Sequence, residues 1–90
     1  MRNLQFTGDF YGYTITIIQI QKRTAKKLYD AGETIYIQAC NMHPFGVWST
    51  CYDITKEKDC VTFDTIVNNF EYYNCSAETG LYTTFYKRIS

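Results

Sequence analysis

The chain has 90 residues and a mass of 10.6 kDa, which is enough for one compact domain and short for two. A hydrophobic fraction of 46% with 20% charged residues excludes an intrinsically disordered tail. Nine basic residues balance nine acidic ones, and a formal net charge of zero excludes both a general DNA-coating protein and an acidic mimic of nucleic acid. We expect one domain over residues 1–90, with residues 1–12 as an N-terminal arm or an edge strand.

Nothing in the sequence indicates a membrane segment or secretion. No stretch approaches the ~20 apolar residues of a membrane-spanning helix, and residues 1–9 lack an apolar stretch followed by a small-residue cleavage site. We therefore expect a cytoplasmic protein without membrane contact, in which the four cysteines are reduced thiols.

The first part of the chain predicts a strand and then a short helix. Residues 13–20 alternate at first, but Ile17, Ile18 and Ile20 occupy both parities, so a β-bulge or burial on both faces is expected near Ile18. Thr24 is a candidate N-cap for the helix, and Gly32 stands where a left-handed C-terminal cap is needed.

The middle of the chain predicts two strands separated by a loop. Residues 34–40 alternate between apolar and polar side chains and predict one strand, and residues 47–54 predict the next. The loop at 41–46 contains the only proline. The charged run at 55–59 predicts a solvated turn.

The clearest element is a helix over residues 63–74. Its apolar side chains recur at helical spacing, at Phe63, Ile66, Val67 and Phe70, and Thr62 is its candidate N-cap. A turn at 76–80 and a final strand at 81–89 follow.

These elements predict an α+β fold with a mostly antiparallel sheet of four to five strands and two helices packed on one face. The opposite face is then expected to be open and to carry hydroxyls and aromatic rings, namely Thr14, Thr16, Tyr36, Gln38, Tyr82, Thr84, Tyr86 and Arg88.

A basic cluster and three tyrosines are the candidate binding residues. Four of the nine basic residues lie within six positions, at Lys22, Arg23, Lys26 and Lys27. Lys26 and Lys27 fall in the first turn of the predicted helix, where the dipole favours an anion, so they predict a docking point for a phosphate backbone or an acidic protein surface; the alternative is a solvated helix face.

Tyr36, Tyr82 and Tyr86 have two functional interpretations. They can stack unpaired bases, or they can be contact residues of a protein interface. The protein interface is favoured because only Lys87 and Arg88 supply basic side chains near these rings.

The sequence gives little evidence for catalysis or metal binding. Cys40 and His43 have C-x2-H spacing, and Cys51 and Cys60 are weak candidates to complete a zinc site, but the spacing does not form two ligand pairs of the zinc-finger kind. We expect neither metal nor cofactor, with the thiols packed as small hydrophobes. We also expect no enzyme, since His43 has no accompanying Ser or Cys motif, although a thiol enzyme pairing His43 with Cys51 or Cys75 stays open.

A resemblance rests on Ala25 to Tyr29, Cys40 to Met42 and, most specifically, Phe70-x-Tyr72-Tyr73-Asn74-Cys75 followed by Glu78-x-Gly80. Over about residues 24–86 the chain resembles short proteins carried by phages and mobile elements of Gram-positive gut bacteria. The resemblance implies a role inside the bacterial host cell. Small proteins in that setting are often stoichiometric inhibitors of host defence, including anti-CRISPR proteins.

We therefore expect a non-enzymatic inhibitor that binds a host defence nuclease such as a CRISPR effector. The expected partner-binding residues are Lys22, Arg23, Lys26, Lys27, Tyr36, Tyr82, Tyr86 and Arg88. The alternative is a small nucleic-acid-binding or regulatory protein of the phage or mobile element. The two differ in salt dependence, because phosphate-driven binding weakens steeply with salt and an aromatic protein interface does not.

Overall fold

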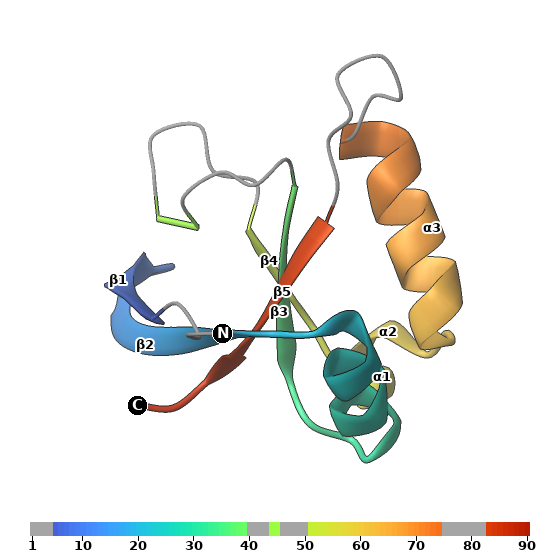
Figure 1. The fold of residues 1–90 in the computed structure, drawn as a ribbon, viewed down its shortest axis with the longest axis horizontal. Coiled ribbons are helices and arrows are strands. Elements are labelled where there is room, and N and C mark those ends of the chain that lie inside the picture. The colour runs from blue at the N-terminus through green and yellow to red at the C-terminus, as the bar shows by residue number, and fades with distance from the viewer. Residues whose placement is uncertain (1–4, 40–43, 46–50, 75–82) are drawn as a thin grey trace.

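The computed structural model describes residues 5–39, 44–45, 51–74 and 83–90 (Figure 1). These residues form a five-stranded antiparallel sheet and three helices, in the order β1 (Gln5–Phe10), β2 (Tyr13–Ile20), α1 (Lys22–Asp30), β3 (Ile35–Ala39), β4 (Tyr52–Ile54), α2 (Lys56–Asp59), α3 (Phe63–Asn74) and β5 (Thr83–Arg88). The predicted α+β class is confirmed.

The strands are ordered β1-β2-β5-β3-β4, so the last strand of the chain lies at the centre of the sheet. β1 and β2 form a hairpin that runs in continuous register from Gln5↔Ile18 to Phe10↔Tyr13. β5 then pairs with β2 on one side and with β3 on the other, with Tyr36 opposite Tyr86. This register decides which side chains share a face.

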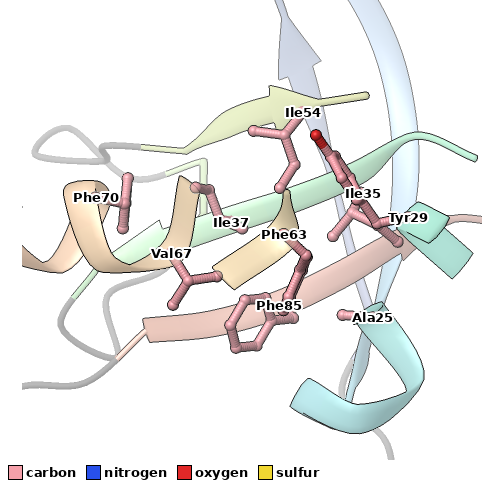
Figure 2. Packing of buried hydrophobic residues seen from close by; sticks show 9 residues of the cluster. All are labelled: Ala25, Tyr29, Ile35, Ile37, Ile54, Phe63, Val67, Phe70 and Phe85. Atoms are coloured by element: carbon pink, nitrogen blue, oxygen red, sulfur yellow. The ribbon is translucent and has the colours of Figure 1, made fainter. Parts of the chain in front are cut away.

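The main core lies between one face of the sheet and the two longer helices (Figure 2). α1 and α3 bury the apolar stripes that their sequences predict, against side chains of β3, β4 and β5. The cluster comprises Ala25, Tyr29, Ile35, Ile37, Ile54, Phe63, Val67, Phe70 and Phe85. The ring of Phe63 packs against those of Phe85 and Tyr29, with centroids 5.5 and 5.7 Å apart.

α3 has the bounds that its periodicity predicts, and Thr62 caps it as expected. The Thr65 N–H donates to Thr62 Oγ1 at 3.2 Å. The expected cap at Gly32 is confirmed as well, since Gly32 has φ +91°. The N–H groups of Gly32 and Glu33 donate to the carbonyls of Tyr29 and Leu28 at 2.9 and 3.0 Å, which is a Schellman motif.

The start of α1 differs from the prediction. The helix begins at Lys22 with Gln21 as its N-cap, so Thr24 lies inside it and is not a cap. Lys22 and Arg23 therefore occupy the first turn in place of Lys26 and Lys27, and Lys27 lies in the last turn. Lys26 and Lys27 are thus not at the positive end of the helix dipole, so the expectation that the dipole favours an anion beside them is wrong.

The charged run after β4 is a one-turn helix, α2, and not only a turn. The Thr55 N–H donates to Asp59 Oδ2 at 2.9 Å, which fixes the start of this helix. Lys58 Nζ lies 3.3 Å from Asp53 Oδ2 and 2.8 Å from the Asp53 carbonyl oxygen, which holds α2 against β4. Residues 47–50 of the predicted strand and residues 81–82 of the last strand lie outside the described part of the chain.

The opposite face of the sheet is covered by a second apolar cluster, so the expectation of an open face is wrong. Its buried members are Ile15, Ile17, Tyr36 and Tyr86, and its partly buried members are Phe6, Phe10, Phe45 and Cys51. Residues paired across neighbouring strands share a face, and β2 pairs with β5 through Ile17 opposite Arg88 and Gln19 opposite Tyr86. The odd-numbered residues of β2, Ile15 and Ile17, therefore lie on the face of Tyr86, and Thr14 and Thr16 do not. Ile20 packs on the main core, so β2 is buried on both faces. This burial on both faces explains why the isoleucines of β2 do not keep to alternate positions.

Candidate functional site

The basic cluster on α1 is exposed, as a binding role requires. Ala25 and Tyr29 anchor the helix in the main core, and all four cations, Lys22, Arg23, Lys26 and Lys27, are exposed. Arg23 and Lys27 each lie two residues from Ala25, about 200° around the helix, so they project away from the sheet. We call these four residues the basic face of α1.

One cation of the basic face is already paired. Lys26 Nζ lies 3.1 Å from Asp64 Oδ2, which links α1 to the start of α3. In the described part of the chain, Lys22, Arg23 and Lys27 have no carboxylate within 4.0 Å. The first turn of α1 also has no acidic residue. The basic face therefore presents three positive charges that no described carboxylate pairs, on a helix that the core holds in place.

Two of the three tyrosines predicted to join this site, Tyr36 and Tyr86, are not on the surface. Tyr36 and Tyr86 are only 6% and 3% exposed. The rings of Phe10 and Phe6 meet them edge-on, at centroid distances of 5.3 and 5.7 Å. The hairpin of β1 and β2 thus covers the face on which these tyrosines were expected to be open.

Burial also fixes the chemistry of these phenols. Desolvation raises the pKa of Tyr36 above 10.0, with Arg88 offsetting part of the effect, and it raises the pKa of Tyr86. Thr84 Oγ1 donates to the Tyr86 oxygen at 3.3 Å. Both phenols are therefore neutral near pH 7. Tyr82 lies outside the described residues, and Arg88 is exposed at the end of β5.

A second candidate site, which the sequence analysis did not identify, lies at the tip of the β1–β2 hairpin. Tyr11 and Tyr13 are 75% and 73% exposed there. They border a pocket of about 250 Å³, which we call the hairpin pocket; it is lined by Phe10, Tyr11, Tyr13, Ile15, Tyr36, Asp53 and Arg88. The sequence carried a signal for the turn but not for the pocket, since Gly12 between aromatic residues marks the reversal of a hairpin.

The weak metal candidates do not converge where the structure describes them. Cys51 is half-buried in the second cluster, whereas Cys60 is exposed after α2 and lines a different pocket, of about 400 Å³, with Tyr29. Among the described residues, no three His, Cys, Asp or Glu side chains lie close enough to hold a metal ion. Cys40, His43 and Cys75 lie outside the described residues.

Comparison of the chain with protein-family models, with curated proteins and with solved structures finds no match. Of the helices that the structure describes, none combines the length and the apolar character needed to cross a membrane. The evidence for function therefore comes from the two surface sites.

Proposed function

We propose that this protein is a non-enzymatic inhibitor that binds a host defence nuclease, as anti-CRISPR proteins do, and that the basic face of α1 is part of its contact surface. The observation that carries the binding role is the exposed positive charge of Lys22, Arg23 and Lys27, which no carboxylate in the described part of the chain pairs, on a helix anchored by Ala25 and Tyr29. The choice of target comes from the resemblance to proteins of phages and mobile elements.

The burial of Tyr36 and Tyr86 favours a protein partner over a single-stranded nucleic acid. A sheet that stacks bases needs exposed rings with basic residues around them. The exposed tyrosines of the described chain are Tyr11, Tyr13, Tyr52 and Tyr72, and none of them is on α1. The alternative, a small nucleic-acid-binding or regulatory protein, keeps only the phosphate backbone as its ligand.

The sign of the charge indicates where on a nuclease such a helix binds. A channel that holds nucleic acid is itself positively charged, so the basic face of α1 does not complement it. We expect the helix to contact an acidic surface outside that channel, where opposite charges accelerate association.

The test reverses the two outward-facing charges with Arg23→Glu and Lys27→Glu together, which leaves the Lys26–Asp64 pair intact. Binding to a purified CRISPR effector should weaken about tenfold, mainly through slower association, with an unchanged circular dichroism spectrum. Lys56→Glu is the control, because Lys56 is exposed on α2 and outside the basic face. Equal inhibition by the double variant and the parent would remove α1 from the interface.

Capture of a partner from cell lysate by the purified protein distinguishes the protein-binding inhibitor from the nucleic-acid-binding alternative. We expect nuclease-treated lysate to yield a bound protein, with an affinity that falls by about tenfold or less between about 50 and 200 mM salt, because only the few charges of the basic face are screened. Capture that disappears after nuclease treatment, together with an affinity loss of several orders of magnitude over that salt range, would instead establish the nucleic-acid-binding alternative.

A further inference from the structure

The turn of the β1–β2 hairpin contains a residue that the turn geometry disfavours. Tyr11 has φ +51° and Gly12 has φ +90°, so both central residues are left-handed, as in a type I′ turn. Asn, Asp and Gly are preferred at the first of these positions, and a bulky residue there is strained. Because the Tyr11 side chain is mostly exposed, core packing does not account for its presence.

Tyr11 borders the hairpin pocket, whose size suits a single side chain. Phe10 and Ile15 form apolar walls, and Tyr11 and Tyr13 stand at the exposed rim. At about 250 Å³ the pocket is smaller than the roughly 300 to 1,000 Å³ of sites for whole small-molecule ligands. The pocket is therefore too small for a whole small-molecule ligand, but it can hold one ring or one aliphatic side chain of a partner.

The charges that line the pocket are not equally compensated. Asp53 is paired with Lys58, whose Nζ lies 3.3 Å from its carboxylate. Arg88 donates from Nε to a main-chain oxygen of Ser90 at 2.9 Å and also hydrogen-bonds to Tyr36. Among the described residues, no Asp or Glu side chain lies within 4.0 Å of Arg88. A guanidinium group has five N–H donors, so Arg88 retains donors for an anion.

We propose that the hairpin pocket binds an acidic, aromatic peptide segment of a partner protein, with an aromatic side chain between Tyr11 and Tyr13 and a neighbouring carboxylate on Arg88. Tyrosine and arginine are the residues enriched in the energetic centres of protein interfaces, which they occupy as anchors around a pocket. The pocket is on the face of the sheet opposite α1, since Tyr36 and Ile15 belong to the second cluster. This site therefore stands or falls independently of the basic face of α1.

The experiment is an NMR titration of the full chain with blocked tripeptides. The acidic aromatic probe is acetyl-Glu-Phe-Glu-amide. Acetyl-Lys-Phe-Lys-amide tests the charge, acetyl-Glu-Ala-Glu-amide tests the ring, and adenosine monophosphate tests a nucleotide as the ligand. We expect the first probe to shift the amide signals of residues 10–15, Asp53 and Arg88, and to bind at least about threefold more tightly than the other three probes.

Three variants locate the interaction. Arg88→Gln should weaken binding of the acidic aromatic probe about tenfold. Lys87→Gln is its matched control, because Lys87 is the preceding residue of β5 and its side chain lies on the other face of the sheet. Tyr11→Asn should weaken the same binding and leave the melting temperature unchanged or raised, because asparagine is favoured in this turn.

Several outcomes would overturn the proposal. They are tighter binding of adenosine monophosphate or of the lysine probe, shifts that map away from the hairpin, an unaltered affinity in Arg88→Gln, and no binding of any peptide at millimolar concentration. A lower melting temperature in Tyr11→Asn would show that Tyr11 serves the fold, which also contradicts the argument made for it.

Discussion

Gly8 is the residue on which the covering of the second sheet face can be tested most directly. A Cβ atom at this position would lie less than 3.0 Å from three side-chain carbons of Phe45. The missing side chain therefore lets Phe45 pack against β1 and, together with Phe6 and Phe10, enclose Tyr36 and Tyr86. One glycine thus connects the 44–45 segment to the hairpin.

We expect Gly8→Ala to destabilise the protein by about 1 to 3 kcal/mol, the usual cost of forcing extra atoms into a packed site. The sign is informative, because without that contact alanine in a strand would be the more stable residue by about 0.5 to 1 kcal/mol. Urea unfolding measures the difference. Asp9→Ala, an exposed neighbour on β1, is the control and should change stability by less than about 0.5 kcal/mol. An alanine variant at 8 that is as stable as the parent would show that Phe45 does not pack there.

At the scale of elements, the end of α1 determines how firmly its basic face is presented. Gly32 has φ +91°, and no atom lies within 4 Å of the position that a Cβ would occupy. Gly32→Ala should therefore act through backbone strain alone and cost about 1 to 2 kcal/mol. Thermal unfolding measures it, with the exposed Glu33→Ala as control, because the Glu33 N–H that completes the cap is unchanged. If Gly32→Ala melts like the parent, the left-handed cap is not what ends the helix.

The elements also show what the sequence could and could not predict. α3 was predicted with its bounds because its four apolar positions repeat at helical spacing and Thr62 caps it. α1 was placed three residues late because Thr24 is a residue type favoured at N-caps, whereas the actual N-cap, Gln21, makes no side-chain capping bond. α2 has only four residues and no buried ones, so no periodicity existed to reveal it. The sequence thus predicted the bounds of a helix best where the spacing of its buried residues and the residue at its N-cap indicate the same start.

The binding sites were harder to predict than the elements. Alternation along residues 34–40 shows that Tyr36 and Ile37 face opposite sides, but not that a hairpin formed by the first strands covers Tyr36. The exposure of the basic face of α1 followed from its composition. The hairpin pocket did not, because Tyr11, Asp53 and Arg88 are distant in the sequence and are brought together only by the order of the strands.

At the scale of the whole molecule, two apolar clusters take up all six Phe and three of the nine Tyr, whereas Tyr11, Tyr13, Tyr52 and Tyr72 are exposed. Six Phe and nine Tyr in 90 residues exceed what one small core takes up. The sheet divides the clustered rings into two groups. The helix side has Tyr29, Phe63, Phe70 and Phe85, and the hairpin side has Phe6, Phe10, Phe45, Tyr36 and Tyr86. The stability of the molecule therefore depends on both faces of the sheet. Its dependence on pH reports on the titratable groups buried on these faces.

Titration of the half-buried Cys51 thiol and of the buried phenols should make the protein sensitive to alkaline conditions. Desolvation raises the pKa of Cys51 from 9.0 to about 12, and burial raises the pKa values of Tyr29, Tyr36 and Tyr86 above 10.0. The folded protein keeps these protons at a pH where the unfolded chain has lost them. The stabilisation is complete below about pH 9 and is lost as the pH rises from there towards about 12.

The urea midpoint should accordingly be constant between about pH 7 and 8.5 and fall steadily above pH 9. Cys51→Ala should make this fall shallower between pH 9 and 10, where the thiol of the unfolded chain titrates first. Cys60→Ala is the control substitution, because Cys60 is a free cysteine on the exposed surface after α2. Equal urea midpoints at about pH 10.5 and pH 7.5 would contradict this prediction. That result would mean that the thiol and the phenols are as hydrated in the folded protein as in the unfolded chain, and that Phe10 and Phe6 do not cover Tyr36 and Tyr86.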